Sequence, residues 1–263
     1  MRKQILAGLL LTLLAPAVVM AQSNFTGTWK IDLKKTQPSK KPSVLLLQDG
    51  VFSCKSCTPA YAVKADGQNH KLVGTPYADT ISAVTSDGGR KVQVKESKNG
   101  KLVMTITASL SADGKTLHTA FNDASDTNSD PVTGTGTFAR AAAGPAGSEP
   151  ISGSWVAAAF TGSDNGNTFT LKVEGDNITM TTPTGQSYTA KLDGADAAYK
   201  GDPGITTASV KRIDKNTIEE TDKRDGKAIF VLRMTLAADG KSMMLTEHNL
   251  RREMIAHDVA IKQ

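Results

Sequence analysis

The sequence predicts an all-β protein made of two tandem antiparallel up-and-down β-barrels, with about eight to ten strands in each. Three observations lead to this prediction. The second half of the chain repeats the first, turn signals recur roughly every ten residues, and short β-prone stretches lie between the turns. A meander of that kind exposes two edge strands, and closing it into a barrel removes them.

The N-terminal segment has the pattern of a secretory signal. Arg2 and Lys3 precede an apolar run from Ile5 to Val19, and Val19 and Ala21 supply the small residues that signal peptidase requires. We therefore expect residues 1–21 to be a signal peptide and the mature protein to be periplasmic or secreted. No later apolar run is long enough to cross a membrane, so a soluble mature chain without a transmembrane segment is predicted.

The charge distribution is that of an ordinary solvated surface. The whole chain has a formal net charge of +5, and without residues 1–21 it has 29 Lys and Arg against 26 Asp and Glu. The signs are mixed along the chain, and aromatic residues make up only 5% of it. A nucleic-acid binder would show a basic stripe with aromatics between its charges, so we exclude that class of partner.

The two halves share segments in the same order at a nearly constant spacing. Phe25–Trp29 matches Ile151–Trp155, and the turn Ser111–Lys115 matches Ala237–Lys241, both at an offset of 126 residues. Matches in the same order over the whole mature chain indicate a duplication.

Between the two copies, residues 141–150 are small, polar and rich in Pro and Gly, which is typical of a linker. We predict one barrel over residues 22–140 and a second over residues 151–263. Each has enough residues to bury its own core, so we expect each copy to fold without the other.

Within each copy, Gly occurs where tight hairpins require positive φ, as in the two Ala-Asp-Gly-Lys turns. No convincing amphipathic helix lies between such turns. The β-prone stretches of the first copy are 28–33, 44–47, 61–65, 80–85, 91–95, 102–110 and 116–121, and those of the second are 169–173, 178–182, 207–213, 217–221, 229–236 and 242–246.

Two short segments carry a family resemblance. Gly27-Thr28-Trp29 and Gly153-Ser154-Trp155 resemble the Gly-x-Trp signature of the calycin superfamily, which includes lipocalins and fatty-acid-binding proteins. The second copy, through residues 188–194, 211–219 and 236–241, is similar to a set of uncharacterised secreted bacterial proteins with tandem lipocalin-like domains. The likeness covers nearly the whole mature chain.

The resemblance implies that each Trp closes one end of its barrel and that a basic side chain from the end of the same copy packs over it. Arg140 is then the partner of Trp29, and Lys262 the partner of Trp155. Fatty-acid-binding proteins place two lid helices after the first strand, but residues 34–42 leave no room for them. A lidded fatty-acid carrier is therefore disfavoured.

Cys54 and Cys57 allow three interpretations. In an oxidising compartment they can form a disulfide across a β-turn, which is the interpretation that we favour. A thioredoxin-like redox pair would need a helix N-terminus that the sequence does not offer, and a metal site would need two further ligands, for which only His70 and His118 are at hand. The second copy has no equivalent pair.

No residue cluster indicates catalysis, and no motif indicates a metal or cofactor. The four histidines, His70, His118, His248 and His257, lie in no nucleophile or zinc motif. Glu220 and Asp222 could share one strand face and act as an acid and a base. We favour a hairpin rim balanced by Lys223 and Arg224, and predict no catalytic residue.

These observations favour an exported, non-catalytic protein that holds a small, mostly apolar ligand in one or both barrels. The alternative is a structural or protein-interaction module of the cell envelope with side-chain-filled barrels. A small-molecule enzyme that uses the barrel interior is the least favoured hypothesis. The interior volume of the barrels distinguishes the first hypothesis from the second.

Overall fold

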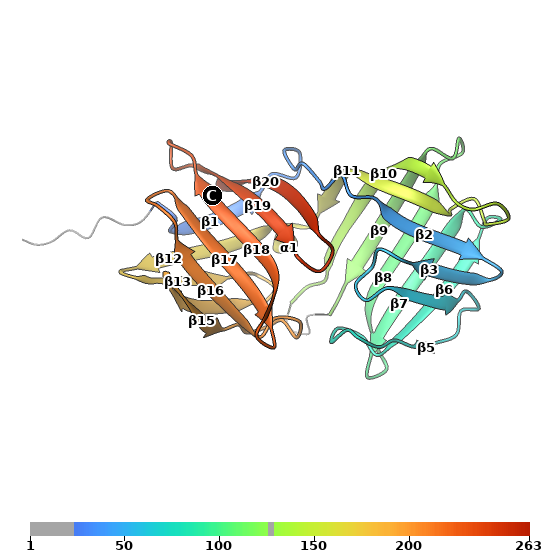
Figure 1. Cartoon of the computed structure of the whole chain (residues 1–263), viewed down its shortest axis with the longest axis horizontal. Coiled ribbons are helices and arrows are strands. Elements are labelled where there is room, and N and C mark those ends of the chain that lie inside the picture. The colour runs from blue at the N-terminus through green and yellow to red at the C-terminus, as the bar shows by residue number, and fades with distance from the viewer. Residues whose placement is uncertain (1–23, 126–128) are drawn as a thin grey trace, which may run out of the picture.

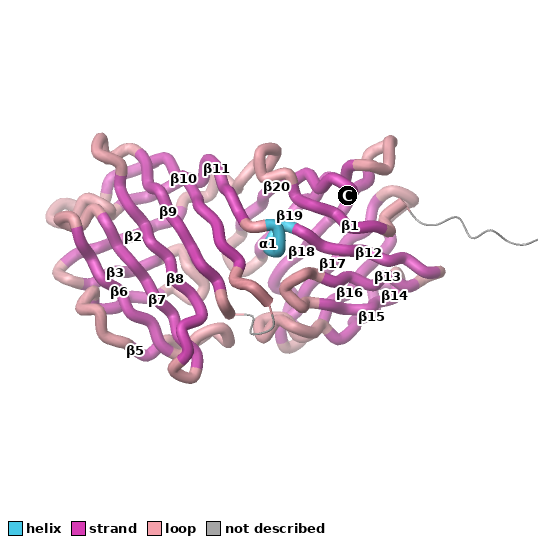
Figure 2. Tube along the Cα trace, turned by 180° about the vertical axis from the view of Figure 1, so that it is seen from behind, coloured by secondary structure: helices cyan, strands magenta, loops and turns pink. Residues whose placement is uncertain are grey.

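The computed structural model describes residues 24–125 and 129–263, so the expected signal peptide lies outside the described residues. The described chain forms two antiparallel sheets of ten strands, each curled into a nearly closed barrel (Figure 1). One helical turn, α1 (Asp164–Asn167), lies between the barrels (Figure 2). The predicted fold class, two antiparallel β-barrels, is confirmed.

Barrel 1 contains, in sheet order, β4 (Tyr61–Lys64), β3 (Val51–Cys54), β2 (Ser43–Gln48), β11 (Gly153–Gly162), β10 (Val132–Ala143), β9 (Thr116–Asp123), β8 (Lys101–Leu110), β7 (Lys91–Lys98), β6 (Thr80–Ser86) and β5 (His70–Lys71). Barrel 2 contains β14 (Ser187–Lys191), β13 (Asn177–Thr181), β12 (Thr168–Glu174), β1 (Gly27–Ile31), β20 (Met254–Lys262), β19 (Ser242–Asn249), β18 (Lys227–Leu236), β17 (Thr217–Arg224), β16 (Thr207–Arg212) and β15 (Asp193–Ala198).

The two copies exchange their first strands. β1 lies in barrel 2, where Trp29 stands between Phe169 of β12 and Lys262 of β20. β11 lies in barrel 1, where Trp155 stands between Arg140 of β10 and Ser43 of β2. Figure 1 shows the exchange as a blue strand, β1, set among the yellow-to-red strands of barrel 2. The expectation that each barrel is one continuous stretch, 22–140 or 151–263, is therefore wrong.

The expected linker is also placed differently. β10 ends at Ala143 and β11 begins at Gly153, and these two strands pair antiparallel. Residues 144–152 are therefore a hairpin loop that connects two strands of barrel 1. A segment rich in Pro and Gly suits a turn as well as a linker. The chain crosses between the barrels elsewhere, through residues 32–42, which we call the crossing segment, and through residues 163–167, which include α1.

The strands follow the alternation of their sequences. In β9 the side chains of Leu117, Thr119 and Phe121 face the interior of barrel 1, and the residues between them face outward. The two Ala-Asp-Gly-Lys turns adopt the expected conformation, with φ of 72° at Gly114 and 63° at Gly240.

Each barrel has its own apolar core, and the tryptophan of that core comes from the exchanged strand. Trp29 is buried in the core of barrel 2 and Trp155 in that of barrel 1, with exposed fractions of 0% and 1%. The guanidinium of Arg140 lies 4.1 Å from the ring centre of Trp155, and the ammonium of Lys262 lies 5.2 Å from that of Trp29. The four expected residues thus form two cation–π pairs, but across the copies and not within them.

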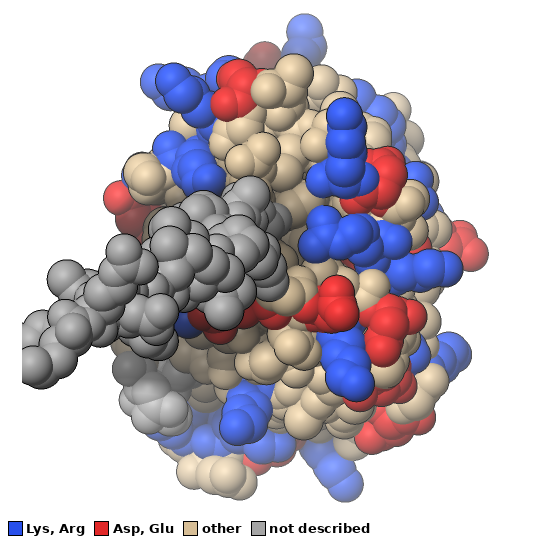
Figure 3. Space-filling model, turned by 90° about the vertical axis from the view of Figure 1, so that its left-hand side faces the viewer, with Lys and Arg blue, Asp and Glu red and all other residues tan. Residues whose placement is uncertain are grey.

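The surface is mixed in charge. Figure 3 shows the end of the molecule formed by barrel 2, where Lys and Arg side chains are scattered among those of Asp and Glu. Among the described residues, no helix has the length and apolar character needed to span a bilayer.

Candidate ligand-binding site

Barrel 1 contains a partly open cavity of about 350 Å³, which we call the barrel 1 cavity. Its wall is mainly apolar and includes Phe52, Val94, Ile106, Leu117 and Phe138. A space of this size is within the range of pockets that hold small organic ligands, and well above what one or two waters need.

The cavity exists because barrel 1 has small side chains where barrel 2 has larger ones. The ladder registers match Ala108 and Thr119, which stand opposite each other in barrel 1, with Met234 and Leu245 in barrel 2. Both residues of barrel 1 line the cavity. The difference in side-chain volume leaves space in barrel 1 that barrel 2 fills at the same positions.

Gly136 shapes the cavity wall. A Cβ atom at Gly136 would lie 2.7 Å from Oγ1 of Thr119 and 2.8 Å from the ring of Phe138, so no side chain fits there without movement. The absent side chain leaves room for Phe138 and Phe160, whose rings pack edge to face at 5.8 Å between centroids. These two rings form the end of the wall that faces barrel 2.

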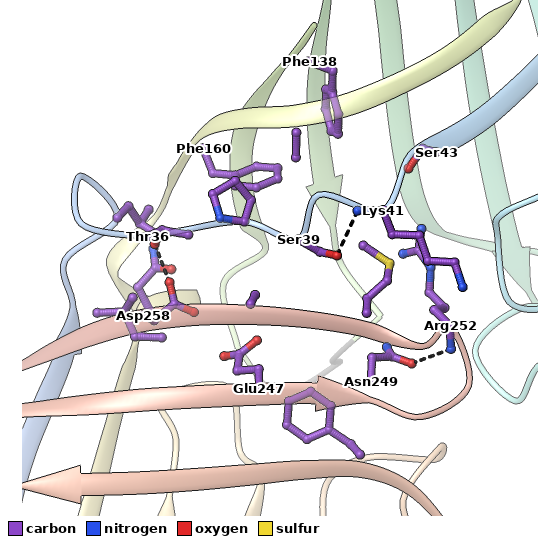
Figure 4. A pocket seen from close by; sticks show the side chains of 18 residues that line it. Thr36, Ser39, Lys41, Ser43, Phe138, Phe160, Glu247, Asn249, Arg252 and Asp258 are labelled. Carbon is purple, nitrogen blue, oxygen red and sulfur yellow. Dashed lines mark hydrogen bonds between the residues drawn. The ribbon is translucent and has the colours of Figure 1, made fainter. Parts of the chain in front are cut away.

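An arginine of barrel 2 lines the barrel 1 cavity. Arg252 belongs to the loop between β19 and β20, and its backbone N–H donates to Oδ1 of Asn249 at 3.0 Å (Figure 4). Its Nε is shielded from solvent and has no hydrogen-bond partner among the described residues. Burial lowers the pKa of Arg252, and no carboxylate among the described residues counteracts this effect.

A second space of about 490 Å³, the junction pocket, lies between the barrels (Figure 4). Barrel 1 contributes Phe138 and Phe160, barrel 2 contributes Glu247 and Asp258, and the crossing segment passes along it. Phe138, Phe160 and Arg252 line both the junction pocket and the barrel 1 cavity, so the two spaces adjoin.

Glu247 and Asp258 form a carboxyl pair in the junction pocket. Burial raises the pKa of Glu247 to about 7, and the charge of Asp258 and a hydrogen bond with it act in the same direction. The hydroxyl of Thr36, in the crossing segment, donates to Asp258. At neutral pH the pair therefore holds a proton in about half of the molecules, whereas an isolated glutamate would have lost it.

Glu220 and Asp222 lie deeper in barrel 2. They are only 5% and 6% exposed, and the Tyr188 hydroxyl donates to Oε2 of Glu220 at 2.6 Å. Burial raises the pKa of Glu220 and raises that of Asp222 to about 9, with Glu220 adding to the effect on Asp222. The hairpin-rim interpretation is wrong, because alternation along β17 points both side chains inward.

The basic residues expected to balance these two acids, Lys223 and Arg224, pair with other carboxylates. Lys223 forms an ion pair with Asp196, and Arg224 lies 3.8 Å from Asp225. Glu220 and Asp222 line neither the barrel 1 cavity nor the junction pocket. They are paired carboxyls of the core, with Asp222 mainly protonated at neutral pH, and not an acid and base that face either space.

The other residues singled out in the sequence are spread over the molecule. Cys54 and Cys57 form a disulfide and both line the barrel 1 cavity. His70 pairs with Asp66 at 2.8 Å on the surface, and a ring nitrogen of His257 lies 3.2 Å from the Thr246 hydroxyl. Within residues 24–125 and 129–263, no group of three or more His, Cys, Asp or Glu side chains is placed to hold a metal ion.

Sequence reasoning missed Arg252. The only available signal was the pair Arg251-Arg252 in a hairpin loop, where basic residues are ordinary surface features. Its importance depends on a contact with the other barrel, which the repeat pattern does not contain. Comparisons of the sequence with protein-family models and with curated proteins gave no match.

Proposed function

We propose that the protein is a periplasmic or secreted, non-catalytic binding protein that holds a small, mostly apolar ligand in barrel 1. The observation that supports this proposal most directly is the mainly apolar, partly open cavity of about 350 Å³ in barrel 1. Burial of an apolar molecule in a preformed cavity of this kind is favourable, by roughly 25 cal/mol for each Å² of apolar surface removed from water.

The likeness of Gly27–Trp29 and Gly153–Trp155 to the calycin signature agrees with this function, since lipocalins hold ligands inside such barrels. The two barrels then differ in role. Barrel 2 fills the matching positions with Met234 and Leu245, and it contributes Arg252 to the site in barrel 1.

A neutral fluorescent probe tests the proposal. N-phenyl-1-naphthylamine is apolar and fluoresces in a dry environment, so titration of the full mature chain should show saturable binding at one site. The double variant A108M/T119L introduces the side chains that barrel 2 has at these positions. It should fold, because barrel 2 accommodates the same residues, and should weaken probe binding by at least about tenfold.

The matched control is T107M/A120L. Thr107 and Ala120 stand opposite each other on the same two strands but point outward, so the variant adds the same side chains without filling the cavity. It should bind the probe as the wild type does. The proposal is overturned if the wild type does not bind, or if the filled variant binds as tightly as the control.

A further inference from the structure

Arg252 is a half-buried arginine, and part of its guanidinium is shielded from water without a partner. Its Nε has no accessible surface and no hydrogen-bond partner among the described residues. An arginine has five N–H donors in a fixed planar fork, and leaving a shielded donor such as Nε unpaired costs free energy. A ligand that accepts hydrogen bonds from this fork would recover that free energy.

Neighbouring charges do not fill this role. Glu253, the next residue, forms an ion pair with Lys41 at 3.2 Å. Glu247 and Asp258 influence each other in the junction pocket, where Asp258 accepts a hydrogen bond from Thr36. Glu96 and Asp123 line a further pocket that Arg252 also borders, but among the described residues neither carboxylate forms an ion pair with it. Burial raises the pKa of Glu96, and the charge of Asp123 adds to this effect.

The position of Arg252 is fixed from two sides. Its own N–H is held by Asn249, and the Lys41–Glu253 pair ties the hairpin loop to the crossing segment. The side chain lies where the barrel 1 cavity meets the junction pocket. A molecule with one end among the apolar side chains of the cavity would therefore have its other end at Arg252.

We propose that Arg252 binds the anionic head group of an amphiphilic ligand whose apolar part occupies the barrel 1 cavity. This inference rests on the proposed function and adds the chemical class of the ligand: an apolar body with one carboxylate, sulfonate or phosphate group. Charge-assisted bonds from an arginine fork to such oxygens are among the strongest hydrogen bonds in proteins. The complete site needs both barrels.

A pair of fluorescent probes separates this inference from the proposed function. 1-Anilinonaphthalene-8-sulfonate and N-phenyl-1-naphthylamine share one aromatic skeleton, and only the first carries an anion. In the R252M variant of the full chain, the affinity for the sulfonate should fall by about tenfold or more, while that for the neutral probe stays within about twofold. R252K should bind the sulfonate with intermediate affinity, because it keeps the charge without the fork.

R251Q is the control, since Arg251 is exposed and adjacent, lines neither the barrel 1 cavity nor the junction pocket but only the pocket beside Glu96 and Asp123, and the variant also removes one positive charge. It should leave both affinities nearly unchanged. An equal loss of sulfonate binding in R251Q and R252M would overturn the inference, because a diffuse field would then explain the effect. Unchanged sulfonate binding in R252M, with the neutral probe still bound, would overturn it while leaving the proposed function intact.

A second measurement needs no variant. Decanoate and decanol have the same chain length and differ in the charge of the head group, so each is used to displace the neutral probe from the wild type. Decanoate should displace it at a concentration about tenfold lower or more. Equal displacement would overturn the inference even if R252M failed to fold, and absence of neutral-probe binding would overturn the proposed function with it.

Discussion

Interior carboxyl groups distinguish barrel 2 from barrel 1 at matched positions. The ladder registers place Glu220, Glu247 and Asp258 where barrel 1 has Val94, Phe121 and Gly136. The burial of these acids is tolerated because Glu220 accepts a hydrogen bond from Tyr188 and Asp258 accepts one from Thr36, and because burial raises the pKa values of Glu220 and Glu247. Barrel 1 has a carboxyl of this kind in Glu96, which stands at the position of Asp222 and whose pKa is also raised by burial, so the two interiors differ at three positions and agree at this one.

The stability of the protein should fall as pH rises from about 5 to about 9. The pKa of Glu247 is about 7 and that of Asp222 about 9 in the folded state, above the values of about 4 expected for unfolded Glu and Asp. Between the unfolded and folded pKa values the native state binds more protons, so the free energy of unfolding decreases with pH.

Glu247→Gln removes one of these titrations. Thermal melts at intervals of pH should show a smaller decrease between pH 5 and pH 7 than in the wild type, and a similar decrease at higher pH. Glu174→Gln, at an exposed ion pair with Lys172, serves as the control and should follow the wild-type curve. If E247Q keeps the full decrease below pH 7, Glu247 does not titrate there.

At the scale of single elements, strand pairing overrides local propensity. The β-prone stretches of the sequence did not include β10 or β20. In β10 the reason is its composition, because Gly134, Gly136 and a run of alanines are residues that are depleted in strands. In the structure β10 pairs on both sides, with β9 and β11, over most of its length. Ladder hydrogen bonds and the close contact of Phe121 and Phe138 with its glycines stabilise a strand that propensity does not favour.

An engineered disulfide tests the strand exchange. The Oγ1 atoms of Thr28 and Thr170 lie 3.0 Å apart across β1 and β12, so the T28C/T170C variant should cross-link within one chain. The control is T28C/V44C. In barrel 1, Ser154 of β11 stands opposite Val44, so an unexchanged β1 would bring Thr28 to that position.

Peptide mass mapping of the non-reduced monomer distinguishes the two arrangements. We expect a link between positions 28 and 170 in T28C/T170C, and no link between positions 28 and 44 in T28C/V44C. A link between 28 and 44 as the main product would show that β1 stays in the barrel of its own copy.

At the scale of the whole molecule, the exchange couples the two barrels. Each barrel lacks a strand and a core tryptophan without the other copy. Further contacts join them: Tyr77 of barrel 1 donates to Asp202 of barrel 2 at 2.8 Å, and Lys30 pairs with Asp164 at 2.8 Å. The site at Arg252 depends on this fixed arrangement, since its cavity and its charge come from different barrels.

Cutting the loop at residues 144–148 should not separate the two copies. With a specific protease site inserted there, the cut leaves β1–β10 on one fragment and β11–β20 on the other, so each fragment supplies one strand to the other's barrel. Immediate size-exclusion chromatography under native conditions should give one peak that contains both fragments, and denaturant should resolve them. Two separate folded fragments without denaturant would contradict the exchange.

Much of the candidate site lay within reach of the sequence. The disulfide between Cys54 and Cys57 followed from spacing and compartment, and alternation along strand 116–121 places Thr119 on the same face as Leu117 and Phe121. The inward direction of Glu220 and Asp222 was available by the same rule, but adjacent basic residues favoured the wrong interpretation. Arg252 could not be assigned, because its environment comes from the opposite barrel.

The residue pattern is enough to specify a duplicated ladder of hairpins, since alternation and turn residues act over a few positions and repeat in both copies. It did not determine which copy closes which barrel. β1 and β11 carry nearly the same Gly-x-Trp segment, so either strand offers similar local pairing energy to either barrel. The pairing of β1 with barrel 2 and of β11 with barrel 1 depends on long-range contacts. Residues 32–42 and 163–167 cross between the barrels, and their paths set which contacts form at the junction.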